Sequence, residues 1–246
     1  MAVLILGGTA EARDIARRLH EEAADFMSSL AGRVARPRLP VGQVRVGGFG
    51  GVAGLAEFLL RFPISAVVDA THPFSAGMSR NALAACDQTR TPLLRLERPG
   101  WAGAPGSQSW HWVDSHDAAA KCANLVGSRP FLTVGRQSLA QFLQPLAERD
   151  VLARVVDRPD IELPRAWRVI TSRGPYELDA ERDIMRSHQA DVLVTKDSGG
   201  NYTWAKMQAA AELGLRVVVV RRARPTQNAL VVHDVELAAA WARRWR

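Results

Sequence analysis

The sequence predicts an α/β protein built on parallel sheets, and three observations lead to this fold class. Short apolar runs rich in Val, Ile and Leu recur along the 246 residues, which is typical of strands buried on both faces of a parallel sheet. Amphipathic stretches of helical length separate these runs, so strands and helices alternate. A glycine pair, Gly7-Gly8, joins the first run to the first helical stretch, where many α/β proteins turn around a phosphate.

The elements fall into two sets of strand–helix units. We expect strands at Val3–Leu6, Ala66–Asp69, Leu93–Leu96, Phe131–Val134, Val151–Val156, Arg168–Thr171, Asp191–Thr195 and Arg216–Val220. We expect helices at Ala10–Glu22, Gly54–Arg61, Ser75–Asp87, Ser115–Asn124, Gln137–Leu146, Leu178–His188, Tyr202–Leu213 and Val235–Trp245. The Pro/Gly-rich stretch Pro99–Gly106 is interpreted as a linker. The predicted architecture is two Rossmann-like domains with parallel sheets, residues 1–100 and 101–246, with an active-site cleft between them.

Composition argues against several classes of protein. No apolar run reaches the roughly 18 residues of a membrane helix, and the N-terminus lacks a secretory pattern, so we expect a cytoplasmic protein. Cys86 and Cys122 are far apart in the sequence, which argues against a disulfide framework and a zinc site. The net charge of +7 fits either nucleic acid or an anionic small ligand, but basic residues form no long block, which favours the small ligand.

The glycine turn is the first candidate site, because it follows a strand and opens a helix. Glycine lets the backbone approach a phosphate, and the helix N-terminus presents N–H groups to it. The pattern departs from G-x-G-x-x-G because Thr9 and Ala12 occupy the second and third glycine positions. A tight turn without a ligand is the alternative. The cofactor-binding candidates here are Gly7, Gly8, Thr9, Ala10 and Glu11, with the Thr9 hydroxyl as a possible donor.

The stretch that follows the first strand and the first helix should select the dinucleotide, because the next strand of such a fold ends there although its apolar run is not evident. An acidic residue there accepts hydrogen bonds from the ribose of NAD, whereas arginine favours the extra phosphate of NADP. The stretch Ser28–Arg38 contains no acidic residue and offers Ser29, Arg33 and Arg36. The sequence therefore favours NADPH over NADH. Solvated surface arginines are the alternative.

Two further loops are candidates in the first half. Gly47–Gly51 has four glycines in five residues, so it is a loop that could bring Gly48 and Phe49 against a flat ligand. A flexible connector is the alternative. Asp69–Phe74 follows a strand, and we expect Thr71 to bind cofactor and His72 to contact a ligand or act in catalysis. A hydrogen-bonded structural histidine is the alternative.

The second half places polar and basic residues at strand ends. Lys196 follows a buried strand in a chain with only two other lysines, and lysine can give up a proton where arginine does not. Arg136 and Arg173 end two other strands. Ordinary turns with ion pairs are the alternative. The remaining candidates are Asp197, Ser198, Gly199 and Thr203 after the same strand as Lys196, and Tyr176 near Arg173.

Six motifs, in order along nearly the whole chain, resemble the precorrin-6A reductases of cobalamin biosynthesis. They are Leu4-Ile5-Leu6-Gly7-Gly8-Thr9-x-Glu11-Ala12, Ser29-Leu30-Ala31-Gly32-Arg33, Arg45-Val46-Gly47-Gly48-Phe49-Gly50-Gly51, Asp69-Ala70-Thr71-His72-Pro73-Phe74, Ser172-Arg173-Gly174-Pro175 and Thr195-Lys196-Asp197-Ser198-Gly199-Gly200. The resemblance implies NADPH-dependent reduction of one ring-D double bond of a contracted tetrapyrrole, giving precorrin-6B. It also implies two Rossmann-like domains with the active site between them. The motifs do not separate metal-free from cobalt-containing substrates.

This chemistry assigns expected roles to the candidates. Guanidinium groups bind carboxylates well, so Arg136, Arg173 and Arg98 could hold the acetate and propionate groups of a tetrapyrrole, with Ser198, Gly199 and Thr203 as further substrate contacts. The candidate proton donors, or groups that stabilise the ring electrostatically, are, in order, Lys196, Tyr176, His72 and Asp197. We expect no bound metal and no nucleic-acid or membrane partner. The chain is expected to be a monomer or a homodimer.

Two other functions stay open on the sequence alone. One is an NADP-dependent reductase of another acidic small molecule. The other is a non-catalytic protein that senses a dinucleotide or docks on nucleic acid through its basic surface.

Overall fold

A computed structural model describes residues 1–223 and 229–245 of the chain. The chain forms two compact units, one made of Met1–Pro99 with Ala223–Arg246 and the other of Gly100–Arg222. Each unit contains a six-stranded sheet in which every paired strand is parallel. The expectation of an α/β fold with two parallel, Rossmann-like sheets is therefore confirmed.

The sheet of the first unit has the order β12-β5-β4-β1-β2-β3. Its strands are β1 (Ala2–Leu6), β2 (Phe26–Leu30), β3 (Gln43–Val46), β4 (Ile64–Asp69), β5 (Leu93–Leu96) and β12 (Leu230–Val232). The chain runs outward from β1 through β2 and β3, and then returns to the other side of β1 with β4. The strand order therefore reverses between β1 and β4, and in open α/β sheets ligands bind at the carboxyl ends of the strands at such a point.

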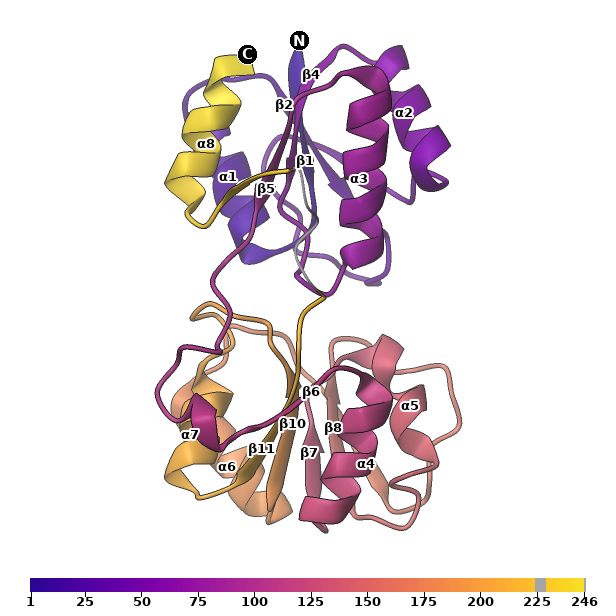
Figure 1. Cartoon of the computed structure of the whole chain (residues 1–246), viewed down its shortest axis with the longest axis vertical. Helices are drawn as coiled ribbons and strands as arrows, with labels where there is room; N and C mark the ends of the chain where they lie inside the picture. Colours follow the sequence, from indigo (N-terminus) through magenta and orange to yellow (C-terminus); the bar gives the residue numbers. More distant parts are fainter. Residues whose placement is uncertain (224–228, 246) are drawn as a thin grey trace. The chain divides into compact units, whose positions relative to one another are not determined.

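Helices cover both faces of this sheet. α1 (Ala10–Glu21) and α8 (Val235–Ala242) lie on one face, and α2 (Gly51–Arg61) and α3 (Ala76–Thr89) lie on the other (Figure 1). Val3 and Ile5 pack in the core under α1, whereas Leu4 and Leu6 pack in the core under α2 and α3. Because successive side chains of a strand point to opposite faces, a strand covered on both sides needs a continuous apolar run.

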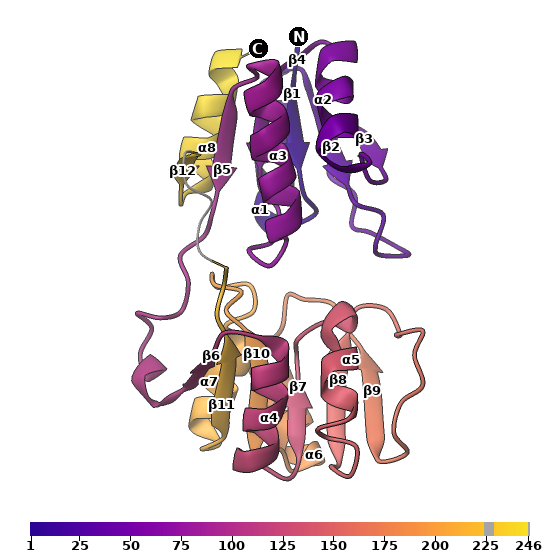
Figure 2. The same ribbon diagram turned by 45° about the vertical axis from the view of Figure 1, so that its right-hand side comes forward.

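The sheet of the second unit has the order β6-β11-β10-β7-β8-β9. Its strands are β6 (His111–Val113), β7 (Pro130–Leu132), β8 (Val151–Val155), β9 (Trp167–Thr171), β10 (Val192–Lys196) and β11 (Arg216–Val220). α4 (His116–Val126) and α5 (Ala140–Leu143) lie on one face, with α6 (Leu178–His188) and α7 (Ala205–Glu212) on the other (Figure 2). Here the order reverses between β7 and β10, which makes their carboxyl ends the second expected ligand position.

The predicted strands are all present within two residues of their expected bounds, but four strands lay outside the predicted runs. In β2, Ser28 and Ser29 interrupt the apolar pattern. The other three, β3, β6 and β12, have only three or four residues and lie at sheet edges, where half-exposed side chains give little apolar signal. The helix expected at Gln137–Leu146 is a 3-10 turn, η2 (Arg136–Ser138), followed by the short α5.

The end of the chain differs from the prediction that residues 101–246 form one domain. β12 pairs with β5 of the first unit, and the Glu97 N–H donates to the Val232 carbonyl at 2.9 Å. Ala238 and Ala242 of α8 are buried in the core under α1. This strand and helix cover an edge and a face that the first hundred residues leave open. A strand–helix pattern alone does not say which of two sheets it joins.

Candidate functional site

The carboxyl edge of the first sheet is shaped by Gly7, which follows β1. Its φ of +122° is a conformation that side chains rarely allow, and a Cβ placed there would lie 2.7 Å from the Ala70 carbonyl oxygen. Its N–H donates to the Ser29 carbonyl at 3.0 Å. Glycine is therefore required where β1, β2 and β4 end together, and α1 begins three residues later with N–H groups that have no acceptor within the helix.

Thr9 caps α1 and connects it to the end of β4. Its hydroxyl accepts from the Ala12 N–H at 3.1 Å and donates to the Ala70 carbonyl at 2.9 Å. The sequence analysis expected the Thr9 hydroxyl to donate to a phosphate. In the structure this hydroxyl already donates to the Ala70 carbonyl. Thr9 positions the turn, and the Gly7 N–H is used by the Ser29 carbonyl, so any contact with a phosphate is left to the backbone of Gly8 and Ala10.

Glu11 lies in the first turn of α1 and pairs with Arg98. One guanidinium nitrogen lies 2.7 and 2.8 Å from the two carboxylate oxygens. Burial raises the pKa of Glu11, but the charge and hydrogen bond of Arg98 outweigh it, so the pKa lies below its ordinary value. Arg98, expected as a substrate clamp, is engaged with Glu11 in the first unit.

Arg45 organises the end of β2 and the glycine loop after β3. It lies opposite Ser29 in the sheet register, and its guanidinium donates to the carbonyls of Gly47 at 2.6 Å and Gly48 at 2.7 Å. The same group lies 4.0 Å from the centre of the Phe49 ring. Phe49 also packs edge-on against Phe58. The loop that was expected to be either a ligand contact or a flexible connector is thus held in place by one arginine.

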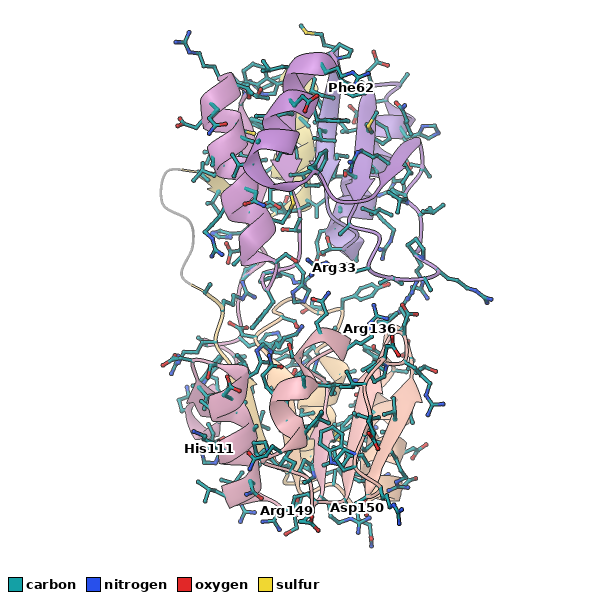
Figure 3. All side chains as sticks on the ribbon, turned by 90° about the vertical axis from the view of Figure 1, so that its right-hand side faces the viewer. Arg33, Phe62, His111, Arg136, Arg149 and Asp150 are labelled. Carbon is teal, nitrogen blue, oxygen red and sulfur yellow. The ribbon has the colours of Figure 1, made fainter. Side chains whose placement is uncertain are left out.

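Arg33 and Arg36 lie in the exposed loop that follows β2. Figure 3 labels Arg33 at the carboxyl edge of the first sheet. They are on the correct side of the sheet to reach a group near Ser29. Their preference for the 2′-phosphate of NADPH stays a prediction.

The loop after β4 is fixed by a buried network around Asp69. One carboxylate oxygen accepts from the Thr71 N–H at 3.0 Å and from the Thr71 hydroxyl at 2.7 Å. Arg95 lies 2.8 Å from the same oxygen and donates to the Thr71 hydroxyl at 2.9 Å. The Thr71 side chain therefore supports the loop from inside. Thr71 lies at the switch point of the sheet, so the predicted contact with cofactor rests on this position and not on a free hydroxyl. A small cavity beside the network is lined by Arg95, Ser79 and Glu97.

His72 is half-buried next to this network. Its Nδ1 accepts from the Phe74 N–H at 3.1 Å, so in the neutral ring the proton is on Nε2. This hydrogen bond fixes the ring after the strand end. His72 belongs to the first unit, while the other three candidate proton donors belong to the second.

Lys196 ends β10 at the switch point of the second sheet. Its amine lies 3.5 Å from the position that a Cβ on Gly135, after the neighbouring β7, would take. Burial lowers the pKa of Lys196 to about 8. Burial also lowers the pKa of His116, at the start of α4, and the positive charge of Lys196 lowers it further. A lysine in this position holds a proton that it can release near neutral pH.

The loop after Lys196 contains the other predicted residues of this strand end. Asp197 and Ser198 are buried, and Asp197 accepts from the Trp101 N–H and pairs with Arg222. Gly199 has a φ of +65°, and Thr203 has a buried hydroxyl oxygen with no hydrogen-bond partner in the described structure. The Thr203 hydroxyl therefore has unused hydrogen-bonding capacity in a buried position, and its contact with substrate stays a prediction.

Tyr176 lies on a buried ion pair that the sequence analysis did not identify. Arg154 of β8 and Glu181 of α6 form a salt bridge with side chains 3% and 1% exposed. The Arg154 guanidinium lies 3.9 Å from the centre of the Tyr176 ring, and the Tyr176 hydroxyl donates to the Ser172 carbonyl at 3.3 Å. Burial raises the pKa of Tyr176, so the phenol keeps its proton. These contacts fix the loop that contains Arg173.

Arg136 and Arg173 are half-buried at the same carboxyl edge as Lys196. Arg136 begins η2, the first element after β7, and Arg173 follows β9; Figure 3 labels Arg136. The second sheet therefore gathers two guanidinium groups and one amine at its carboxyl edge. An arrangement of this kind can bind an anionic ligand and deliver a proton to it.

The supporting residues left a detectable signal in the sequence. Arg95 and Arg154 are single arginines inside otherwise apolar strands. A charge in such a run indicates a buried partner, because an unpaired buried charge is costly. Arg45 gave a weaker signal, since β3 is short and half-exposed.

The described part of the chain has neither a cluster of metal ligands nor a membrane-spanning helix. No group of three or more His, Cys, Asp or Glu side chains is placed to hold a metal ion among the described residues. Within the same residues, no helix has both the length and the apolar character needed to cross a membrane.

Comparisons with known proteins give a consistent result. Residues 2–243 match the family model described as precorrin-6x reductase CbiJ/CobK. The chain is 45% identical to a precorrin-6A reductase of Rhodococcus erythropolis, over 97% of this chain and 96% of that protein. It is 31% identical to a cobalt-precorrin-6A reductase of Salmonella typhimurium, over 98% and 94%. The solved structure of a CobK precorrin-6A reductase superposes with a TM-score of 0.91 at 36% identity, covering 99% of this chain and 96% of that one.

Proposed function

This chain belongs to the precorrin-6x reductase family of cobalamin biosynthesis, and on that premise we propose that NADPH is its reductant and metal-free precorrin-6A its substrate. The family consists of oxidoreductases that act on a carbon–carbon double bond. The observation that carries the proposal is Lys196, a lysine whose pKa burial lowers to about 8, at the switch point of a sheet edge with two arginines.

The first unit fits a dinucleotide. At Gly7 only glycine is tolerated, so the backbone at the end of β1 can lie against a phosphate, and the start of α1 supplies N–H donors and a partial positive charge. Arg33 and Arg36, with no acidic residue nearby in the β2 loop, support NADPH over NADH. NADPH, when bound, supplies the hydride.

The second unit fits the acidic tetrapyrrole. Arg136 and Arg173 bind carboxylates of the substrate, and the Thr203 hydroxyl offers a further hydrogen bond. Lys196 donates the proton to the carbon next to the one that receives hydride. The reduction of one double bond then balances with one hydride and one proton. Tyr176 is a weaker candidate for the donor because its hydroxyl already donates to Ser172.

The relatives support the metal-free substrate. The relative from Rhodococcus erythropolis, named for precorrin-6A, is 45% identical, and the one from Salmonella typhimurium, named for the cobalt form, is 31% identical. The higher identity extends over nearly the whole chain. We therefore propose the metal-free substrate as the preferred one.

The origin of the two hydrogens tests this function. NADPH that carries deuterium at both hydride positions of the nicotinamide, reacted in ordinary water, should place one deuterium in the product. Ordinary NADPH in heavy water should place one deuterium on the adjacent carbon. The proposal fails if no deuterium comes from the cofactor, or if NADH reacts as well as NADPH at equal concentration.

A further inference from the structure

The second unit is entered and left at neighbouring points. The chain enters it at Gly100-Trp101 and leaves it at Arg222. Between these two segments lies Asp197, the residue that follows Lys196 at the end of β10. Its side chain is buried, and its N–H donates to the Val220 carbonyl at 2.9 Å.

Asp197 binds both segments with its carboxylate and its backbone. One carboxylate oxygen accepts from the buried Trp101 N–H at 2.9 Å. The other lies 3.2 Å from the Arg222 Nε, which also donates to the Asp197 carbonyl at 2.9 Å. Both carboxylate oxygens thus face donors, so the group is built as an acceptor. This arrangement argues against Asp197 as the proton donor that the sequence analysis included among its candidates.

The entry segment is closely fitted to this carboxylate. A Cβ on Gly100 would lie 2.6 Å from a carboxylate oxygen of Asp197. The Trp101 indole N–H donates to the Gly200 carbonyl at 3.3 Å, and the ring packs edge-on against Trp204 with centroids 5.9 Å apart. The entry segment, the exit segment and the loop of residues 197–204 are therefore connected to one another through the buried Asp197 and Trp101.

We propose that Asp197 is a positioning residue, which holds the loop of residues 197–204 in its substrate-binding shape by fastening the entry and exit segments to the end of β10. The proposal rests on the proposed function, because that loop contains Ser198, Gly199 and Thr203 as substrate contacts. Asp197 acts through these neighbours and through the place of Lys196, without contacting the reacting atoms.

Two variants disturb this arrangement in different ways. Asp197→Asn keeps an oxygen for the Trp101 N–H but turns an amide group towards Arg222. Gly100→Ala changes no polar group and only presses a methyl against the carboxylate. Asp197→Asn loses a charge-assisted hydrogen bond, and the methyl of Gly100→Ala pushes the carboxylate out of its hydrogen-bonded position. We therefore expect each variant to raise the KM for precorrin-6A by about tenfold or more, with an unchanged Kd for NADPH.

Each variant has a matched control. Asp191 precedes β10, at the opposite end of that strand, and its carboxylate accepts from the Ser128 N–H at 2.6 Å and the Arg129 N–H at 2.9 Å. Asp191→Asn therefore weakens similar hydrogen bonds at the amino end of β10, away from the predicted substrate site. It should leave the KM for precorrin-6A unchanged. A Cβ on Gly103 would meet nothing within 4 Å, so Gly103→Ala is the control for Gly100→Ala.

Amide hydrogen exchange tests the same proposal without substrate. Exchange in residues 197–204 should be at least about tenfold faster in Asp197→Asn and Gly100→Ala, and unchanged in both controls. The proposal is overturned if exchange and KM match those of the controls, or if Asp197→Asn lowers kcat and alters its pH profile at constant KM. If Asp197→Asn does not fold, the comparison of Gly100→Ala with its control Gly103→Ala tests the proposal by the same two measurements. A wild-type enzyme that reduces no precorrin-6A refutes the proposed function alone, since exchange still tests the loop.

Discussion

Replacing Lys196 by methionine should make the protein more stable and the enzyme nearly inactive. Methionine keeps most of the side-chain volume and removes the charge. Burial lowers the pKa of Lys196 from 10.5 to about 8, and each pH unit of that difference corresponds to about 1.4 kcal/mol. The charged form therefore costs about 3.5 kcal/mol at most. Because the side chain is half-buried and water screens part of the effect, we expect Lys196→Met to gain about 1–2 kcal/mol at neutral pH.

The pH dependence gives this prediction a definite sign. Below about pH 8 the lysine is protonated in both the folded and unfolded chain, so the full cost is present. Between about pH 8 and 10.5 the unfolded chain binds more protons, and the stability of the wild type rises with pH. The advantage of Lys196→Met should therefore be largest below pH 8 and disappear above about pH 10.5.

Urea unfolding across this pH range, together with turnover of precorrin-6A, measures both effects. Loss of a general acid predicts a fall in kcat of about a hundredfold or more. Lys121→Met is the control, because Lys121 is exposed on α4 and its removal should change neither quantity. A variant that is less stable than the wild type at pH 7 would refute the burial cost. A variant that keeps its turnover would refute the proton donor.

Three further predictions concern the wild-type chemistry, the cofactor turn and the buried ion pair. Plotted against pH, kcat/KM should fall as pH rises through about 8, the pKa of Lys196; a flat profile would exclude this lysine as the acid. Gly7→Ala should weaken NADPH binding by at least about tenfold, because it combines steric overlap with a φ that alanine avoids, whereas Gly77→Ala, with nothing within 4 Å, should not. Calorimetric titration that gave equal affinities would contradict the role of the turn. Glu181→Gln should destabilise the fold by about 3 kcal/mol, since it leaves Arg154 buried without its partner charge. Unfolding by urea should show that loss, with the exposed Asp183→Asn as control, and an equal effect of both would refute it.

The sheet edges could be predicted from the sequence because the strand signals were strong. Buried strands such as β1 and β10 are continuous apolar runs, and the residues that follow them are then placed by the topology of a parallel sheet. The positions of Gly7, Thr71, Arg136 and Lys196 near strand ends follow from these runs, while their roles in binding and catalysis stay predictions. The short edge strands were not found, because half-exposed side chains give no continuous run.

The direction of each side chain could not be predicted. The sequence marked Thr9 and Asp197 as polar residues at strand ends, but both use their polar atoms inside the protein. Their partners, Ala70, Trp101 and Arg222, are 25 to 96 residues away in the chain, and contacts at that separation depend on the fold rather than on local pattern. For the same reason, the sequence did not predict that β12 and α8 belong to the first unit.

The most direct test of the central claim is NADPH oxidation, followed by absorbance, with precorrin-6A and separately with its cobalt form. We predict oxidation coupled to reduction of the metal-free substrate, with the cobalt form slower. Oxidation with the cobalt form alone would contradict the proposed substrate and leave the reductase chemistry standing. NADPH binding without reduction of either compound would contradict the assignment of this chain as a tetrapyrrole reductase.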